Sequence, residues 1–210
     1  MNQKTKPCLI SCSVLRKEIE KLVQQGKLDA DLVFVSKYFH VDYAQIEKNL
    51  RPVIEKTLQR YPGNVILVYG DLCLGMDNEM KKLAEEYGIT KVDAVNCIDC
   101  QLGGKGKFLE ADPNHDLLFL SPRMTDFFSH AIAIMRKEGL GETAIKQFFK
   151  GIRGIVLIDT LGNAAELKAE VEKLDTDLEI LETRDIGCEN VKNVIRDAIE
   201  RNKEIAGKPS

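Results

Sequence analysis

The sequence predicts an α/β protein with a mostly parallel sheet and helices on both faces, a Rossmann-like three-layer sandwich. Two observations predict this fold class. Short runs rich in β-branched residues recur along the chain, and amphipathic stretches at helical spacing separate one run from the next. This alternation is typical of βα units, and the turns between them are marked by glycine and proline.

The expected strands are the short apolar runs. The clearest of them is Asn-Val-Ile-Leu-Val-Tyr at 64–69, whose continuous apolar character predicts a buried strand. The full set of expected strands is 8–13, 31–36, 64–69, 91–95, 116–121, 154–159 and 177–182.

The expected helices lie between these runs. In the first of them Leu15, Ile19 and Leu22 recur at helical spacing, and Gly26 supplies a stop. The segment 96–108 is rich in glycine and is expected to be irregular. The expected helices are 15–26, one through Ile46, Leu50, Ile54 and Leu58 to Pro62-Gly63, and 79–88, 125–137, 142–149, 164–174 and 189–205.

The length and charge limit the class of protein. A chain of 210 residues is expected to form a single α/β domain over 1–210, or two halves of about 1–120 and about 121–210. The 30 basic residues are scattered among 33 acidic ones, which argues against a nucleic-acid partner. The sequence shows neither a signal peptide nor an apolar stretch long enough to span a membrane. We therefore expect a cytoplasmic protein that does not bind a membrane.

Soft metal-ligand residues follow four consecutive expected strands. Cys12 ends the first run, His40 follows the second, Cys73 follows the third, and Cys97 and Cys100 follow the fourth. In a parallel sheet the carboxyl ends of the strands share one edge, where ligands bind. Thiolate and imidazole suit the tetrahedral demands of zinc, so the sequence predicts a zinc site there, either structural or open to substrate.

Other interpretations of these residues stay open. Cys12 fits a small apolar residue of the core, and His40 fits a helix cap. Cys97-Ile-Asp-Cys100 also fits a dithiol that cycles to a disulfide, although glycines follow it and metal binding is favoured. The remaining cysteines, Cys8 and Cys188, are expected to be structural. His115 and His130 are expected to have no special role.

The segments around these residues together resemble domain-of-unknown-function family 1638. They are LISCSVLRKEIEKL with Cys12, KYFHVDYAQIEKNL with His40, ILVYGDLCLG with Cys73, and NCIDCQLGG with Cys100. Members of that family carry a cysteine near the N-terminus, a Leu-His pair, a Tyr-Gly-x-Cys-Gly turn and a His-Asp-Cys segment before a glycine. The resemblance covers roughly residues 8 to 160. Here Ile98 replaces the family histidine and Cys97 has no counterpart.

The resemblance implies a role in one-carbon or corrinoid metabolism. The family is common in methanogenic archaea and other anaerobes, where its genes often stand beside corrinoid-dependent methyltransferases. A zinc-bound thiolate is a good methyl acceptor, so we expect a methyltransferase-type enzyme or an accessory protein of methyl transfer, acting with a small molecule or a corrinoid protein. The alternative is a carrier for a corrinoid, a haem-like ring or an iron-sulfur cluster. The sequence does not indicate whether the protein is a monomer or an oligomer.

The expected site has ligands and surrounding residues. Cys12, His40, Cys73 and Cys100 are the expected ligands, and Cys97 is an additional candidate ligand or redox thiol. Residues next to them in the sequence are expected to orient the ligands or to contact a cofactor. The orienting residues are Asp99, Tyr69 and Gly70, and the cofactor contacts are Gly103 and Gly104 in a turn that covers the site.

Overall fold

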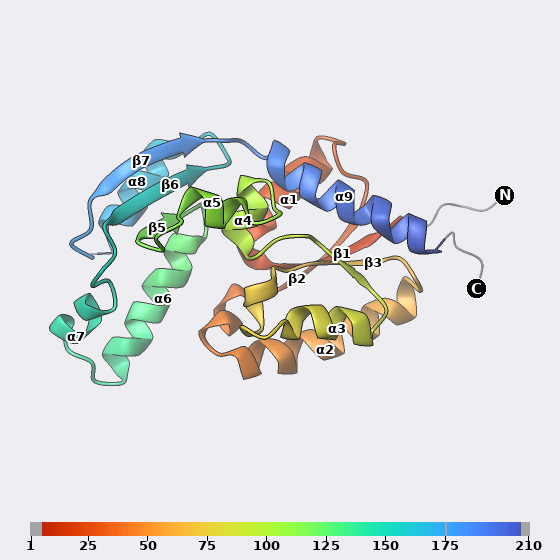
Figure 1. The fold of residues 1–210 in the computed structure, drawn as a ribbon, viewed down its shortest axis with the longest axis horizontal. Helices are drawn as coiled ribbons and strands as arrows, with labels where there is room; N and C mark the ends of the chain where they lie inside the picture. The colour runs from red at the N-terminus through yellow and green to blue at the C-terminus, as the bar shows by residue number, and fades with distance from the viewer. Residues whose placement is uncertain (1–5, 175, 207–210) are drawn as a thin grey trace. The chain divides into compact units, whose positions relative to one another are not determined.

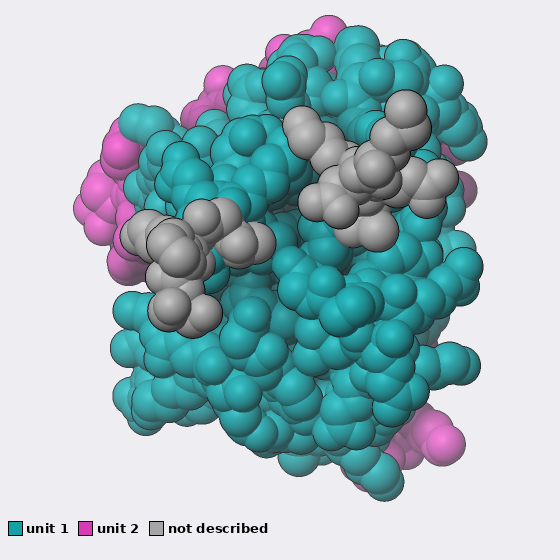
Figure 2. All heavy atoms as spheres, turned by 90° about the vertical axis from the view of Figure 1, so that its right-hand side faces the viewer, with its two compact units in different colours: residues 1–107, 188–210 teal, residues 108–187 magenta. Residues whose placement is uncertain are grey.

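The structure is a computed structural model that describes residues 6–174 and 176–206. The chain forms two compact units (Figures 1 and 2). Unit 1 is residues 1–107 with 188–210, and unit 2 is residues 108–187. Unit 2 is therefore an insertion into the sequence of unit 1. Each unit has its own parallel sheet.

The sheet of unit 1 is built from the most apolar runs of the chain. Its strands are all parallel and stand in the order β2-β1-β3-β4. Every residue of β1 and β3 is buried, as expected for central strands covered on both faces. The order reverses at β1, because β2 pairs on one side of it and β3 on the other. The strands are β1 (Cys8–Cys12), β2 (Asp31–Val35), β3 (Val65–Val68) and β4 (Thr90–Lys91).

Long helices cover both faces of this sheet. Figure 1 shows α1 (Arg16–Gln24) and α9 (Glu189–Ala206) on one face, with α2 (Tyr43–Arg60) and α3 (Glu79–Glu86) on the other. Each helix buries an apolar stripe against the sheet; in α2 the stripe includes Ile46, Leu50 and Ile54.

Short helical turns lie at the carboxyl edge of the sheet. The turn η1 (Ser13–Leu15) follows β1, η2 (Lys37–Val41) follows β2, η3 (Asp71–Cys73) follows β3, and α4 (Cys97–Leu102) comes after β4. The first two turns are joined because the Ser13 hydroxyl accepts a hydrogen bond of 2.9 Å from the backbone N–H of Lys37. Of the five expected site residues with a thiol or an imidazole, Cys12 ends a strand. The other four, His40, Cys73, Cys97 and Cys100, lie in these turns or in the short helix α4.

The last helix returns to unit 1 after unit 2 and is tied to the sheet by polar side chains. The Thr90 hydroxyl donates to Asn202 Oδ1 at 2.9 Å, and the Asn202 amide donates to the carbonyl of Gly63 at 3.1 Å. The Asn190 amide donates to the carbonyl of Gln101 at 3.0 Å, which joins α9 to α4. Helix α9 is thus part of the fold of unit 1.

Unit 2 has a smaller parallel sheet in the order β5-β6-β7. Its core forms between the sheet and α8, where Leu120, Ile155 and Leu167 are among the buried residues. The middle strand β6 is buried along its whole length. The strands are β5 (Leu117–Leu120), β6 (Gly154–Asp159) and β7 (Ile180–Asp185), and the helices are α5 (Lys107–Ala111), α6 (Met124–Lys137), α7 (Glu142–Gln147) and α8 (Ala164–Glu172).

The structure confirms the α/β class with parallel strands and helices on both faces, but it has two sheets where we expected one. Three expected segments were wrong. Strand β4 has two residues instead of the expected 91–95. Beyond it, the N–H of Val92 still donates to the carbonyl of Leu67, and the carbonyls of Ala94 and Val95 accept from the turn after β3. The segment 96–108, expected to be irregular, contains α4. The last strand lies three residues later than 177–182, because Asp177 adopts a left-handed turn with φ of 59°.

No helix in the described part of the chain combines the length and the apolar character needed to cross a membrane.

Candidate functional site

The candidate site lies where the strand order of unit 1 reverses. Strands β1 and β3 are neighbours there, and the chain leaves them toward opposite sides of the sheet. Such a switch point leaves a crevice outside the carboxyl ends of the two strands, which is where open α/β sheets bind ligands. Cys12 is the last residue of β1, and Tyr69 directly follows β3.

A small cavity occupies this position and collects most of the expected site residues. Its free volume is about 10 Å³, close to the least space that holds one water molecule. All five soft donors line it, together with six other residues. The soft donors are Cys12, His40, Cys73, Cys97 and Cys100, and the other lining residues are Leu15, Val68, Tyr69, Gly70, Val92 and Asn96.

The donors differ in their burial. Cys12, Cys73 and Cys100 are 3%, 8% and 1% exposed, whereas Cys97 and His40 are half-buried. Within the described residues, no three histidine, cysteine, aspartate or glutamate side chains are placed closely enough to hold a metal ion together. The five donors thus share one cavity wall without meeting at a single point.

Gly70 allows the wall formed by η3 to lie against the segment before α4. The backbone N–H groups of Asp71 and Leu72 donate to the carbonyls of Ala94 and Val95 at 3.0 and 2.9 Å. A Cβ atom on Gly70 would lie only 2.4 Å from the Cα of Asn96, so any other residue would push the two segments apart. This close approach brings Cys73 and Cys97 to the same cavity.

Asp99 fixes α4 from within and does not line the cavity. Its side chain is fully buried, and its carboxylate accepts hydrogen bonds from the backbone N–H groups of Val95 at 2.8 Å and Gly106 at 3.1 Å. Asn96 caps the same helix by accepting from the N–H of Asp99 at 2.8 Å. These bonds hold the segments before and after α4, so they set the positions of Cys97 and Cys100.

Gly103 and Gly104 lie in the turn after α4 and also stay outside the cavity. Both have left-handed backbone, with φ of 122° and 72°. Gly104 approaches the carbonyl of Asp93 so closely that a Cβ atom would lie 2.4 Å from it. The observed role of this pair is to let the chain turn closely over the segment that leads into α4.

Tyr69 and His40 form an aromatic wall of the cavity. Their ring centroids lie 6.0 Å apart and their planes differ by 29°, which is a stacked arrangement. Tyr69 is 2% exposed, and no described group forms a hydrogen bond with its buried hydroxyl. Tyr69 therefore contributes a buried hydroxyl without a hydrogen-bond partner to the residues that line the cavity.

Burial governs the charges at the site. It raises the pKa of Cys73 to about 11 and lowers the pKa of His40 to about 4. Burial also raises the pKa of Cys97 well above its usual range, and the neighbouring Cys73, Cys12 and Cys100 thiols add to that rise. The pKa of Cys100 is raised as well, by burial and by Asp99. The imidazole and these three thiols are therefore neutral at pH 7.

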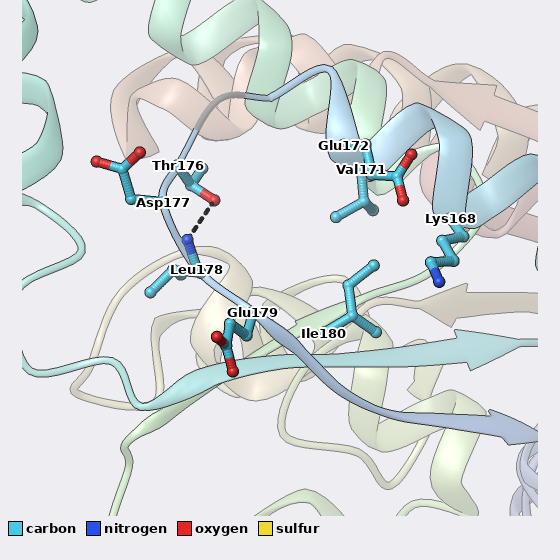
Figure 3. Close-up of a pocket in the computed structure, with 8 residues that line it drawn as sticks. All are labelled: Lys168, Val171, Glu172, Thr176, Asp177, Leu178, Glu179 and Ile180. Atoms are coloured by element: carbon cyan, nitrogen blue, oxygen red, sulfur yellow. Dashed lines mark hydrogen bonds between the residues drawn. The ribbon is translucent and has the colours of Figure 1, made fainter.

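The other cysteines and histidines lie elsewhere. Cys8 begins β1 at the opposite edge of the sheet, and Cys188 precedes α9; neither lines the cavity. His115 and His130 belong to unit 2. A larger, open hollow of about 500 Å³ in unit 2 is lined by a mixture of apolar and charged side chains (Figure 3). Its lining residues are Lys168, Val171, Glu172, Thr176, Asp177, Leu178, Glu179 and Ile180, without a thiol or imidazole among them.

Sequence reasoning missed α4 and the role of Asn96 in presenting Cys97. The information was present, because Asn96-Cys-Ile-Asp99 has a capping residue followed three positions later by an acidic one, which is typical of a helix start. Glycines after Cys100 hid this start, since they suggested a loop. The consequence is that Cys97 is the first residue of a helix and Cys100 lies one turn later.

The fold and this cavity define a class: an α/β protein whose parallel sheet carries soft donor residues at its switch point. The chain belongs to the family described as "Protein of unknown function (DUF1638)", whose model matches residues 34–195. The matched range includes His40, Cys73, Cys97 and Cys100, and it begins after Cys12. No curated protein and no solved structure matches the chain.

Proposed function

We propose that the cavity binds one transition-metal ion, zinc by the nature of its donors, and that Cys12, His40, Cys73 and Cys100 are the ligands. The observation that supports this proposal is the gathering of four thiols and one imidazole, from four separate strand–turn junctions, around a single cavity. Buried cysteines scattered as apolar filler would have no reason to share one wall.

The size and chemistry of the cavity favour an ion. A volume of about 10 Å³ suits one atom of the size of water. Three sulfurs and one nitrogen match the tetrahedral set that zinc prefers. Each cysteine has a single side-chain torsion, so rotation between staggered positions moves its sulfur without moving the backbone. The proposal requires that such rotation bring the donors together at one point.

The proposed activity is methyl transfer to a metal-bound thiol. A thiol substrate would have to take the place of one of the four protein ligands, and the bound metal would let it lose its proton to solvent at neutral pH. The sulfur would then form a bond to the methyl carbon, and the bond between the methyl group and its donor would break with its electron pair left on the donor. A corrinoid protein is the donor suggested by the family resemblance, and its cobalt would keep that pair.

A second candidate function is thiol–disulfide exchange by Cys97 and Cys100. The observation that favours it is the placement of Cys97 at the first position of α4, with Cys100 one turn later. In this reaction the two thiols lose two protons and two electrons to an exogenous disulfide, which is reduced to two thiols. It requires a reversible loss of two titratable thiols in metal-free protein.

The carrier alternative receives less support from the geometry. A corrinoid or haem ring, or a cluster of iron and sulfide, is far larger than a cavity of about 10 Å³. Such a group would have to lie outside the cavity, at its mouth, or the surrounding segments would have to separate. Its bound form would absorb visible light, whereas zinc is colourless.

Elemental analysis of anaerobically purified protein, with an absorption spectrum of the same sample, tests the proposal. We expect about one equivalent of zinc per chain and no visible band. Less than about a tenth of an equivalent of any transition metal, with a two-thiol titration, would favour the dithiol instead. A visible chromophore would favour the carrier.

A further inference from the structure

One edge of the sheet in unit 2 carries exposed and charged side chains. Strand β7 pairs with β6 along one side, and no strand in the described part of the chain pairs with its other side (Figure 1). Leu181, Glu182 and Thr183 of β7 are exposed. In the other edge strand, β5, Phe119 and Leu120 are buried. Strand β7 is therefore the less covered edge of this sheet.

The bonds between β7 and β6 set the direction of the backbone groups in β7. The N–H of Ile186 donates to the carbonyl of Asp159, the last residue of β6, at 3.0 Å. Backbone groups of successive residues in a strand point to alternate sides. The N–H and C=O groups of Thr183 and Asp185 therefore point away from β6. Such outward groups on an edge strand are a template for pairing with another strand.

Opposite charges flank Thr183 on one face of β7. Glu182 and Arg184 are two residues apart in the strand, so their side chains share a face, and Arg184 donates to the Glu182 carboxylate at 2.8 Å. The Arg184 guanidinium also lies 5.9 Å from the centre of the Phe119 ring. The side chains of Arg184 and Glu182 are 30% and 50% exposed, so both charges are accessible at the edge.

We propose that β7 pairs antiparallel with β7 of a second copy of this chain, with Thr183 on the two-fold axis between them. Each Thr183 then donates its N–H to the carbonyl of Thr183 in the other copy. Glu182 lies opposite Arg184 of the second copy, and the two-fold axis repeats this pair with the roles exchanged. Opposite charges that face each other across two strands stabilise the pairing, and here two such pairs form at once.

The same charges argue against the neighbouring registers. Only alternate residues present outward backbone groups, so the axis has to pass through a residue. An axis at Glu182 places two carboxylates opposite each other, and an axis at Arg184 places two guanidinium groups opposite each other. Like charges in these positions destabilise a strand pair. The order of charges in β7 therefore favours the register centred on Thr183.

The pairing is short, which sets the strength of the dimer. A bulge shifts the register between β6 and β7 at Ile155 and Val156, so the regular alternation of β7 begins only after it. One short pair of strands buries less area than the interfaces of stable dimers. The expected dimer is therefore in exchange with the monomer, and its fraction rises with protein concentration.

Sedimentation of the full chain over a concentration series measures the dissociation constant of the dimer. Glu182→Arg and Arg184→Glu each place like charges opposite each other twice, so each should raise this constant about tenfold or more. The double variant, Glu182→Arg with Arg184→Glu, restores both opposite pairs and should dimerise like the wild type. Lys168→Glu and Glu172→Arg are controls that reverse exposed charges on α8, and neither should change the constant.

A mixture of the two single variants tests the register itself. Glu182→Arg has two positive charges at the edge and Arg184→Glu has two negative ones, so the two proteins should pair with each other more tightly than either pairs with itself. Sedimentation with a fluorescent label on one protein measures this mixed dimer. A mixture of Lys168→Glu and Glu172→Arg is the control and should show no such preference.

The backbone bonds have a test of their own in Thr183→Pro. The N–H of Thr183 points away from β6, so proline removes a bond of the dimer and none within unit 2. This variant should dimerise less than the wild type and keep the same circular dichroism spectrum. If it fails to fold, the charge variants still decide the question. A wild type that stays monomeric throughout the series overturns the proposal, and so does a dimer that both single charge reversals leave intact.

Discussion

The carboxyl edges of the two sheets differ in what their polar residues do. In unit 1 the strand order reverses at β1, and the edge there lines a cavity with thiols and an imidazole. In unit 2 the order runs β5-β6-β7 without reversal. Asp159 ends β6 and is 2% exposed, and its carboxylate accepts bonds from the N–H groups of Leu161 and Gly162 at 3.0 and 2.8 Å. That side chain holds its own turn.

In these two sheets, residues at the strand ends gather around a cavity where the strand order reverses, whereas Asp159 stabilises its own turn. All six cysteines of the chain belong to unit 1, and residues 108–187 contain none. Open hollows of about 500 Å³ in unit 2 and about 480 Å³ in unit 1 are lined by neither a thiol nor an imidazole. The soft donors instead line the cavity of about 10 Å³.

The strongest test of this contrast removes one proposed ligand. Cys73→Ser should lower zinc affinity at least about 100-fold, since loss of an outer hydrogen bond to a ligand alone costs about 10- to 100-fold. Competition with a chromophoric chelator measures the affinity. Cys8→Ser is the control, because Cys8 is equally buried in the same strand as Cys12 but lies at the other end of it. Equal losses in both variants would contradict the ligand assignment.

Thiol reactivity gives the next largest effect. Burial raises the pKa of Cys73 to about 11, above the ordinary value of 9.0. At pH 8 its thiolate fraction is then about 0.1% instead of about 9%, so alkylation should be about 100-fold slower than that of an ordinary thiol. The sign is fixed by the raised pKa: the rate in metal-free protein should still increase above pH 10. Mass spectrometry of alkylated peptides measures it, and a plateau near pH 9 would contradict the burial.

Asp99 in unit 1 and Asp112 in unit 2 have similar surroundings and can be compared. Each is buried, and each carboxylate accepts two backbone N–H bonds, in Asp112 from Asp116 and Leu117 at 3.1 and 3.2 Å. Either change to alanine should cost about 1–3 kcal/mol of stability in urea unfolding. Only Asp99→Ala should also weaken zinc binding, by about tenfold, because it loosens the helix that carries Cys97 and Cys100. An equal effect of Asp112→Ala on zinc would remove the contrast between the units.

An effect of similar size, on stability alone, is expected from the backbone of the site. Gly70→Ala should destabilise the protein by about 1–3 kcal/mol, because its Cβ would meet the segment before α4. Gly141→Ala in unit 2 should change stability by less than about 0.5 kcal/mol, since that glycine has an ordinary φ of −71° and open space around it. Thermal unfolding compares the two. A neutral Gly70→Ala would mean that the close approach is not needed.

Much of the fold was predictable because periodicity records burial. The run 64–69 gave β3, and the stripe of Ile46, Leu50 and Ile54 gave α2. Pairing between strands was less accessible, since apolar runs do not state their neighbours; the break between β4 and β5 that makes two sheets was therefore missed. The edge strand β7 was misplaced because none of its residues is fully buried, so its sequence carries a weak apolar pattern.

The lining of the site was predictable to the level of which residues share an edge. Strand ends placed Cys12, His40 and Cys73 together, and they line one cavity. The distances between donors were beyond the sequence, because side-chain rotation decides them. The unpartnered hydroxyl of Tyr69 was also beyond it, since a missing hydrogen bond depends on every neighbour at once.

The return of α9 to unit 1 has a consequence for synthesis. Asn202 bonds to Thr90 and Gly63, and Asn190 bonds to Gln101 in the helix that carries two of the thiols. A nascent chain on the ribosome meets these partners only after the whole inserted unit has been translated. The thiol-bearing wall therefore waits, incompletely assembled, while unit 2 emerges and folds. Solvent therefore has more access to those cysteines during this interval than in the finished fold.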